Sequence, residues 1–358
     1  MTVLVNSNNR RQNADCNVRI KENIPISSLT TMRLGGAARY LAEIQSLDDC
    51  VCALKFAATR GFPVYVLGGG SNVIGRDEGF EGVVLLNKIG GIEVVNESEN
   101  EIVIKAASGE EMDALANLTA KRGWSGLEAL SAIPGTVGGA VVQNAGAYGQ
   151  EIADVLESIK AFDMRVRRVE VLRRNQLDMS YRSSVFNSAA KGRYFILSIT
   201  LRLNKHEIEG ELFSSLESYL AARCIADRSP ATIRDAVIAI RTQKLPDPAI
   251  EANCGSFFKN LTIHENECET LRKAYPDIPI FLSGNSSRIS SGWLIEQCGF
   301  KGQLLHGMRI SNQSALILIN ESARSYRDLA AARAVILATV QERFGFTLEQ
   351  EPEELRAE

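Results

Sequence analysis

Residues 64–72 read VYVLGGGSN, a short apolar run that leads directly into three glycines, a serine and an asparagine. The run predicts a strand over residues 64–67. Consecutive glycines remove Cβ atoms, so the backbone N–H groups of such a loop can approach a phosphate closely. No Gly-Lys-Ser/Thr follows, which excludes a P-loop, and Val73 occupies the third glycine position of a Rossmann fingerprint. The stretch therefore predicts either another kind of phosphate cradle or a simple tight turn.

A second glycine-rich stretch follows, IPGTVGGA at residues 133–140 and QNAGAYG at residues 143–149. Its glycines and small residues are typical of backbone pressed against a large flat ligand, or of two glycine turns packed against each other. The presence of both stretches in one chain favours a dinucleotide held at two points.

Outside these loops, the sequence predicts a mixture of helices and strands. Helices are expected over residues 47–60, 110–122, 290–298 and 326–343 and in a helix-rich region at 211–243. Strands are expected over residues 83–86, 92–95, 102–106, 157–172, 194–203 and 314–319. Residues 126–150 are too rich in glycine to form one regular element. The mixture indicates an α+β multidomain protein, and LPDP at 245–248 predicts a stiff connector at a domain boundary.

Length and composition exclude several classes of protein. The chain has 358 residues, 45% hydrophobic and 23% charged, which fits two or three globular domains. Its net charge of −3 offers no broad basic surface, so no nucleic-acid partner is expected. No apolar run approaches the roughly 18 residues of a membrane helix. Residues 1–20 lack the apolar core of a signal peptide and indicate a flexible tail.

Cysteine and histidine follow no pattern of a metal or hydrolytic site. The seven cysteines include no CxxC pair, so neither a disulfide framework nor a zinc site is expected, and a reducing cytoplasm fits this composition. His206, His264 and His306 stand in no recognised metal spacing. We therefore expect an organic cofactor and no metal.

Two further motifs carry polar groups suited to catalysis. Arg182, in SYRSS at residues 180–184, can neutralise an oxyanion or phosphate through its planar fork of donors, or be an ordinary surface arginine. Ser256, in NCGSFFKN at residues 253–260, places a hydroxyl at the mouth of an apolar pocket or at an ordinary strand end. The acidic residues at 348–353 are, on their own, typical of a solvated terminus.

Taken in order, these segments resemble the UDP-N-acetylenolpyruvoylglucosamine reductase (MurB) family of flavoenzymes. The resemblance runs from about residue 24 to residue 351. It includes both glycine loops together with TMRLGG at 31–36, YR at 181–182, KLPDP at 244–248, GSFFKN at 255–260, GWLIE at 292–296 and KG at 301–302. It implies an α+β fold, with a two-subdomain FAD-binding fold of the vanillyl-alcohol oxidase type and a third, substrate-binding α+β domain.

The resemblance also implies how the chain is divided. Residues 1–20 form the tail, and residues 21–86 form the first FAD-binding subdomain, joined by the C-terminal segment 345–358. Residues 87–243 form the second subdomain, and residues 244–344 form the substrate-binding domain.

The activity implied is reduction of UDP-N-acetylglucosamine enolpyruvate to UDP-N-acetylmuramate, a step in peptidoglycan synthesis. NADPH reduces a noncovalently bound FAD, which gives hydride to C3 of the enolpyruvyl group, and Ser256 protonates C2. Arg182 and Glu351 polarise the substrate carboxylate, with Glu349 as a rival to Glu351. The expected enzyme is a cytoplasmic monomer that binds small molecules, with no membrane partner.

Binding residues follow from the same resemblance. The expected FAD contacts lie in the two loops, at Gly68, Gly69, Gly70, Ser71, Asn72, Pro134, Gly135, Gly138, Gly139, Asn144, Gly146, Ala147 and Tyr148. The expected substrate contacts are Tyr181, Lys244, Asn260, Lys301 and Gln313. The family's diphosphate-clamping tyrosine has no counterpart here, because its position falls at Phe213 or Ser214.

Two alternatives remain beside this hypothesis. An FAD oxidase of the same fold would act on an alcohol or amine, but it needs neither a proton donor nor a carboxylate clamp. A flavin-binding or nucleotide-sugar-binding module would bind its ligand without being reduced by NADPH.

Overall fold

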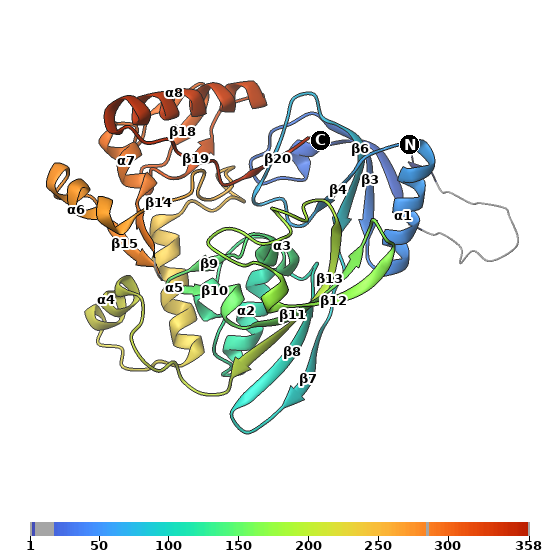
Figure 1. The fold of residues 1–358 in the computed structure, drawn as a ribbon, viewed down its shortest axis with the longest axis horizontal. Coiled ribbons are helices and arrows are strands. Elements are labelled where there is room, and N and C mark those ends of the chain that lie inside the picture. Colours follow the sequence, from blue (N-terminus) through green and yellow to red (C-terminus); the bar gives the residue numbers. More distant parts are fainter. Residues whose placement is uncertain (1, 4–17, 284–285, 357–358) are drawn as a thin grey trace, which may run out of the picture.

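The computed structural model describes residues 2–3, 18–283 and 286–356. Its first sheet has the strand order β1-β2-β3-β6-β4, in which β3, β6 and β4 run parallel. These strands are β1 (Thr2–Val3), β2 (Ile20–Pro25), β3 (Ala37–Ile44), β4 (Val64–Leu67) and β6 (Phe80–Asn87). β4 is an edge strand of this sheet and ends directly before the first glycine loop, so the loop lies at the edge of the sheet (Figure 1).

Helix α1 (Leu47–Arg60) packs against β3 and β6 and has both of its predicted ends. The Ser46 side chain accepts a hydrogen bond from the Asp49 backbone N–H at its start. Gly61 ends it in a left-handed conformation, with φ of 69°. The helix expected over residues 47–60 is confirmed because both of its signals are local.

The second sheet is antiparallel throughout, in the order β12-β11-β13-β8-β7. Its strands are β7 (Ile92–Glu97), β8 (Glu101–Ala107), β11 (Leu156–Asp163), β12 (Arg168–Arg173) and β13 (Tyr194–Asn204). Helix α2 (Met112–Lys121) covers it through a core that includes Ile104, Leu115 and Ile199. Burial of this apolar surface holds the helix on the sheet.

The second glycine stretch contains elements that its composition did not predict. Helix α3 (Val137–Val142) begins after Thr136, whose side chain accepts a hydrogen bond from the Gly139 backbone N–H. The short hairpin β9 (Gly146–Ala147) and β10 (Gln150–Glu151) follows. Glycine is a poor helix former, and this short helix forms because Val137 and Val141 are fully buried against the second sheet.

The C-terminal third of the chain forms a separate group of small elements, orange to red in Figure 1. They are β14 (Leu261–Ile263), α6 (Glu265–Ala274), β15 (Ile280–Ser283), β16 (Ser286–Ile289), α7 (Ser291–Gln297), β17 (Leu304–Leu305), β18 (Met308–Ile310), β19 (Leu318–Asn320) and α8 (Tyr326–Phe344). Phe257, Leu294 and Ile336 belong to their common core.

The strand expected over residues 314–319 is wrong for its first half. Only β19, from residue 318, pairs within a sheet, and residues 314–317 form a turn in which the Ile317 N–H donates to the Ser314 carbonyl. The Leu316 carbonyl instead accepts from the Phe257 N–H at 2.8 Å. The turn therefore interrupts the extended backbone before β19, and Ile317 forms only an isolated bridge, with Ser256.

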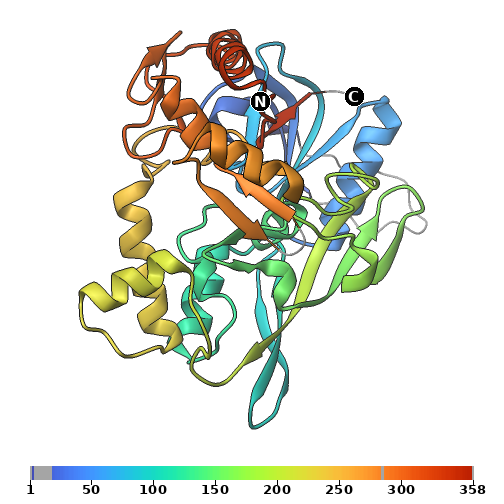
Figure 2. The same cartoon turned by 60° about the vertical axis from the view of Figure 1, so that its left-hand side comes forward.

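Two helices stand at one side of the second sheet (Figure 2). They are α4 (Ser214–Ala222) and α5 (Pro230–Lys244), which share a small core of their own. Ser229 caps α5, and Pro230 occupies its first turn. α5 ends where the KLPDP connector begins, so it links the second sheet's helices to the C-terminal elements.

The end of the chain returns to the beginning of the fold. β20 (Glu353–Leu355) pairs in parallel with β5 (Val73–Gly75), directly after the first glycine loop. In Figure 1, β20 lies beside the blue first sheet although the rest of the C-terminal third lies elsewhere. The C-terminal segment is thus placed against the first loop.

The predicted domain division stays a prediction. Its boundaries after residues 86, 243 and 344 fall within one residue of the ends of β6, α5 and α8. Of the predicted tail, Thr2–Val3 pairs with β2, whereas residues 4–17 lie outside the described residues.

Among the cysteines of the described residues, five are free thiols and one is disulfide-bonded. Cys52, on α1, is disulfide-bonded, which the scattered cysteine spacing did not predict. The free thiols are those of Cys50, Cys224, Cys254, Cys268 and Cys298. In the described part of the chain, no helix is long and apolar enough to cross a membrane.

Candidate active site

A cavity of about 1400 Å³ opens where the two large sheets and the C-terminal elements meet. Its walls include both glycine loops, the connector at residues 245–248, the segment around Ser256 and the C-terminal strand. Ordinary small-molecule pockets have volumes of about 300–1,000 Å³. The cavity therefore has room for a dinucleotide together with part of a second ligand.

The two glycine loops pack directly against each other. A Cβ atom on Gly69 would lie 2.7 Å from the Gly135 Cα, and one on Gly68 would lie 2.5 Å from Thr136 Oγ1. The Ser71 hydroxyl donates to the Pro134 carbonyl at 2.9 Å. The interpretation of two glycine turns packed against each other is thus confirmed, and the loops also line one cavity.

The first loop leaves polar backbone groups for a ligand. Within the described residues, the backbone amides of Gly69, Gly70 and Ser71 donate to no other group of the protein. The Arg241 side chain also lines the cavity, and its buried Nε has no hydrogen-bond partner among those residues. Unpaired donors of this kind suit anionic oxygens such as those of a dinucleotide pyrophosphate. The site therefore fits a dinucleotide cofactor.

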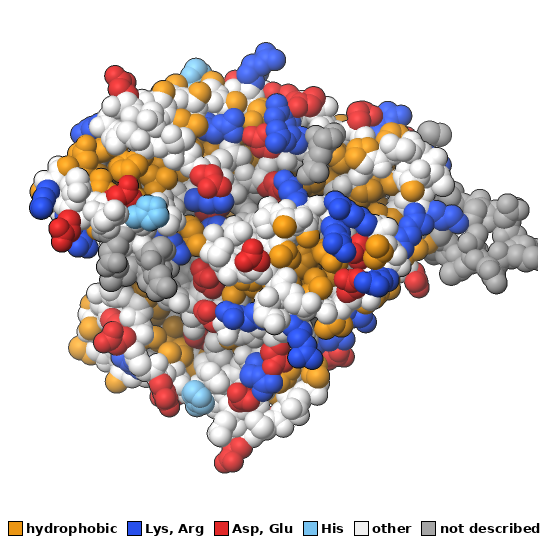
Figure 3. All heavy atoms as spheres, in the orientation of Figure 1, with side chains coloured by type: hydrophobic (Ala, Val, Ile, Leu, Met, Phe, Trp, Pro, Cys, Tyr) orange, Lys and Arg blue, Asp and Glu red, His pale blue; other side chains and the backbone are white. Residues whose placement is uncertain are grey.

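Sequence reasoning missed several basic residues of this cavity. They come from separate segments and are Arg165, Lys191, Arg241 and Arg356. No motif joins them in the sequence, and only the fold brings them together. Over the face shown in Figure 3, basic and acidic side chains are interspersed, and this face has no broad basic patch.

Ser256 lies in an extended segment between two other stretches of backbone. On one side it forms a β-bridge with Ile317, and on the other the Phe257 carbonyl accepts from the Glu351 N–H at 2.9 Å. Gly255, with φ of 73°, turns the chain just before Ser256. This turn breaks the extended alternation, so Cys254 and Ser256 do not share a face as successive alternate residues of a strand would.

Arg182 and Glu351 form an ion pair on the cavity wall. Arg182 Nε lies 2.8 Å from Glu351 Oε1, and the two side chains are only 20% and 13% exposed. Arg182 Nη2 also donates to the Gly146 carbonyl at 3.1 Å. Burial raises the pKa of Glu351 above its ordinary value, while Arg182 and Lys259 oppose this rise. The pair therefore brings a partly desolvated charge of each sign to the cavity.

The structure distinguishes Glu351 from Glu349, the alternative candidate for the catalytic carboxylate. Glu349 does not line the cavity; its side chain is 69% exposed and pairs with Lys259 at 2.5 Å. Glu351 faces the cavity, beside Arg182. The two glutamates thus lie in different surroundings although one residue separates them.

Most of the predicted cofactor residues line the cavity, and three do not. The lining includes Gly68, Gly69, Gly70, Ser71, Asn72, Pro134, Gly135, Gly138, Gly139 and Gly146. Asn144 is fully buried, and its amide donates to the Ser180 carbonyl and Glu151. Ala147 and Tyr148 are outside the lining, and the Tyr148 ring packs against Phe213 with centroids 6.0 Å apart.

The predicted substrate residues are divided in the same way. Gln313 lines the cavity. Tyr181 and Asn260 are not among the lining residues; the Tyr181 hydroxyl accepts from the Asn260 backbone N–H at 3.4 Å. Lys244 lies exposed at the end of α5, and Lys301 pairs with Glu296 at 2.9 Å, so neither lysine lines this cavity.

Two family models match the chain. The model described as "FAD binding domain" matches residues 38–171. The model described as "UDP-N-acetylenolpyruvoylglucosamine reductase, C-terminal domain" matches residues 247–355. Together they cover both glycine loops, Ser256 and the C-terminal strand β20.

Curated relatives match over nearly the whole chain. A UDP-N-acetylenolpyruvoylglucosamine reductase from Ralstonia nicotianae is 38% identical over 333 residues, 92% of this chain and 97% of the relative. One from Alcanivorax borkumensis is 36% identical over 327 residues, 91% of this chain and 94% of the relative.

A solved structure agrees with this fold. The UDP-N-acetylenolpyruvylglucosamine reductase (MurB) of Thermus caldophilus superposes with a TM-score of 0.64 and 23% identity, covering 94% of this chain and 99% of the other. The expected α+β fold, a two-subdomain FAD-binding fold with a third domain, is thereby confirmed. On the identities and the coverage, the chain belongs to the UDP-N-acetylenolpyruvoylglucosamine reductase family.

Proposed function

We infer that this chain reduces UDP-N-acetylglucosamine enolpyruvate to UDP-N-acetylmuramate at the expense of NADPH, and that Ser256, Arg182 and Glu351 carry the protein's part of the chemistry. Family membership supports the overall reaction, a step of peptidoglycan synthesis. When bound, FAD supplies hydride transfer from NADPH to the substrate. The single observation that carries the residue assignment is the Arg182–Glu351 ion pair in the same cavity wall as Ser256.

FAD is held noncovalently by the two glycine loops. The free backbone amides of Gly69, Gly70 and Ser71 would bind its pyrophosphate, and the Pro134–Gly135 turn beside them borders the same space. The cavity's unpaired Arg241 Nε offers a further donor to an anionic group of a bound ligand. This arrangement relies on backbone donors that are already in place, so binding requires little rearrangement.

Ser256 donates the proton that the reduced substrate takes up at C2. A serine hydroxyl is a weak acid in water, but a strongly basic carbanion needs only a short and oriented O–H beside it. The backbone on both sides of Ser256 is held by neighbouring segments, at Ile317 and Glu351. This support fixes the direction of the side chain toward the cavity.

Arg182 stabilises the negative charge that develops on the substrate carboxylate, and Glu351 holds Arg182 in place for this role. Of the five N–H groups of its guanidinium, Arg182 uses one on Glu351 and one on the Gly146 carbonyl. The remaining donors are available to a carboxylate in the cavity. Glu351 keeps the guanidinium fixed, and the desolvated site strengthens each of these interactions.

An anaerobic half-reaction experiment tests this function. Addition of NADPH should bleach the flavin absorbance, and UDP-N-acetylglucosamine enolpyruvate should then restore it. A flavoprotein that NADPH bleaches but that the enolpyruvyl nucleotide does not reoxidise would be an oxidase or another reductase. A flavoprotein that NADPH does not bleach would be a binding module.

The remaining expectations stay part of this proposal. We place the enzyme in the cytoplasm, where its five free thiols fit a reducing compartment, although the bonded Cys52 is unusual there. We expect a monomer, with the domain boundaries near residues 86, 243 and 344. Sedimentation of the holoenzyme and titration of its thiols test the first two of these expectations.

A further inference from the structure

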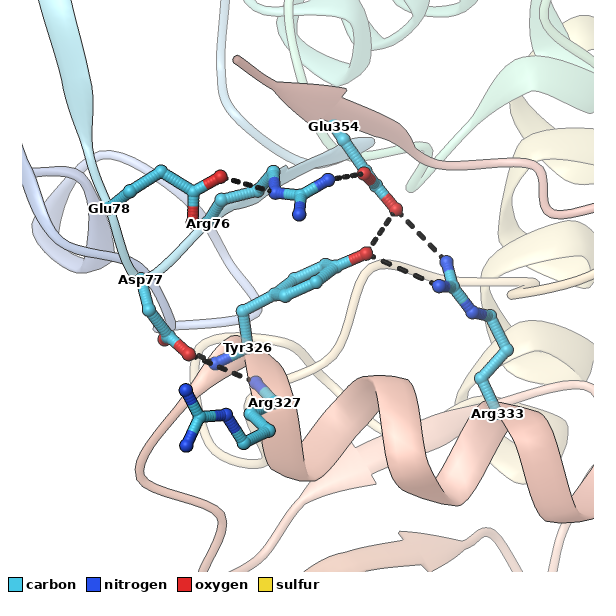
Figure 4. A network of polar contacts seen from close by, with 7 residues as sticks. All are labelled: Arg76, Asp77, Glu78, Tyr326, Arg327, Arg333 and Glu354. Atoms are coloured by element: carbon cyan, nitrogen blue, oxygen red, sulfur yellow. Dashed lines mark hydrogen bonds and ion pairs between the residues drawn. The ribbon is translucent and has the colours of Figure 1, made fainter.

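The carboxylate of Glu354 is shared by three side chains (Figure 4). Its oxygens lie 3.1 Å from Arg76 Nη1, 3.0 Å from Arg333 Nη1 and 2.5 Å from the Tyr326 hydroxyl. The Glu354 side chain is only 15% exposed. Hydrogen bonds to an ionised group are stronger than neutral ones, so this carboxylate is held firmly in one position.

These partners come from opposite parts of the fold. Arg76 directly follows β5, whereas Tyr326 and Arg333 lie on α8. Asp77 adds a second tie, because its carboxylate accepts from the backbone N–H of Tyr326 at 2.6 Å, in the first turn of α8. The Arg76 guanidinium also lies over the Tyr326 ring, 4.7 Å from its centroid. Glu354 therefore joins β20 to both neighbours at once.

The strand that Glu354 fixes leads directly to Glu351. Glu353 N–H donates to the Asn72 carbonyl at 2.9 Å, and Asn72 Nδ2 lies 3.4 Å from the Glu351 carbonyl. Arg333 also donates to the Gln350 side chain, next to Glu351 on its other side. A shift of β20 along β5 would therefore move Glu351 relative to Arg182.

We propose that Glu354 is a positioning residue for the reduction of substrate. By binding Arg76, Tyr326 and Arg333, it holds the C-terminal strand so that the Glu351 carboxylate stays against Arg182 at the cavity. This inference rests on the role proposed above for Glu351. Glu354 borders the same cavity, but its carboxylate is bonded to Arg76, Tyr326 and Arg333, so its effect on the reaction is proposed to pass through Glu351.

A double-mutant cycle separates this role from a general contribution to stability. The variants are Glu354→Gln, Glu351→Gln and the double variant, all tested as holoenzymes, with FAD content, flavin reduction by NADPH and reoxidation by the enolpyruvyl nucleotide measured in each. Glu157→Gln is the matched control, because Glu157 shares Arg202 with Glu101 on the second sheet, away from the cavity.

In Glu354→Gln, we expect reoxidation to slow by about 10- to 100-fold, the order of effect of a small misplacement of a catalytic group. FAD content and flavin reduction should stay within about twofold of the parent protein, since neither needs Glu351 in place. In the Glu351→Gln background, Glu354→Gln should slow reoxidation by no more than a further twofold or so. Glu157→Gln should leave all three quantities unchanged.

Additive effects of the two substitutions, or equal loss in both half-reactions, would overturn the proposal. Unaltered reoxidation in Glu354→Gln would also overturn it, while leaving the proposed function intact. A parent enzyme that the enolpyruvyl nucleotide does not reoxidise would instead contradict the function itself. If Glu354→Gln does not fold, Arg333→Gln removes one partner of the carboxylate, and the same selective loss is expected with a smaller size.

Discussion

Arg182 Nε and Glu351 Oε1 lie 2.8 Å apart, although one residue follows β12 and the other lies near the C-terminus. Through Gly146, the same guanidinium also reaches the second glycine stretch. One side chain thus connects three walls of the cavity. The geometry of the site therefore depends on Arg182 as well as on the groups that meet the ligands.

Arg182→Lys should weaken the second half-reaction strongly. Lysine keeps the positive charge but loses the planar fork that serves Glu351, Gly146 and a carboxylate at once. We expect a loss of roughly 2–4 kcal/mol of transition-state stabilisation, by analogy with removal of one oxyanion donor. Rapid-mixing measurements of flavin reoxidation give this value. Flavin reduction by NADPH should change little, and an equal loss in both steps would indicate a lost flavin contact instead.

Gly69→Ala should weaken FAD binding. The new Cβ would lie 2.7 Å from Gly135 Cα, a backbone atom that cannot rotate away, so the two glycine loops must separate. Overpacking of this kind costs about 1–3 kcal/mol, which corresponds to a weakening of about fivefold or more. The ratio of flavin to protein after dialysis measures the change.

Gly90→Ala is the control for this substitution. Gly90 is exposed, and its new Cβ would meet only the end of the Glu110 side chain, at 3.2 Å. This variant should keep the flavin content of the parent protein. Full flavin retention in Gly69→Ala would show that the contact between the loops does not support the cofactor.

The sequence predicted the elements whose signals are local. Helix α1 is one, because Ser46 and Gly61 mark its ends within the segment itself. The expected strand at 314–319 was wrong for its first half, because residues 314–317 form a turn closed by the Ile317 N–H and the Ser314 carbonyl. Helix α3 was not predicted, because two of its six residues are glycine, which disfavours a helix. Burial of Val137 and Val141 against the second sheet stabilises the helix, and this burial cannot be seen in the local sequence.

The residues of the candidate site also differ in whether the local sequence could identify them. The glycine loops could be identified from composition, because the absence of Cβ atoms is a local property. Arg165, Lys191 and Arg241 could not, since no spacing connects them before the chain folds. Glu351 was separated from Glu349 only by the fold, which exposes Glu349 and turns Glu351 toward Arg182.

Asp163 should make the stability of the second sheet depend on pH. The hydrogen bond from Arg193 lowers the pKa of this buried carboxyl; burial opposes the shift, and the backbone N–H groups of Val166 and Arg165 add to it. A lowered pKa in the folded state stabilises the protein above the unfolded value of about 3.9. This contribution is lost as pH falls below about 3.9 through the folded pKa.

Comparison of the parent protein with Asp163→Asn measures this contribution. The difference in their free energies of urea unfolding should be the same at pH 7 and pH 5 and should shrink between pH 4 and pH 3. A difference that stays constant down to pH 3 would show that the Asp163 charge is not its source.

The most direct test of the account is the reoxidation rate of Ser256→Ala under anaerobic conditions. The variant should bind FAD and be bleached by NADPH at the parent rate, because neither event needs a proton at substrate C2. Reoxidation by UDP-N-acetylglucosamine enolpyruvate should then slow by about 10²–10⁴-fold, the usual effect of losing a positioned acid. Cys254 borders the same cavity, but it should not restore the rate, because Gly255 turns the chain between the two residues and burial raises the pKa of the Cys254 thiol. Reoxidation at the parent rate, in Ser256→Ala and in Ser256→Ala with Cys254→Ala, would contradict the assignment of Ser256 as the proton donor.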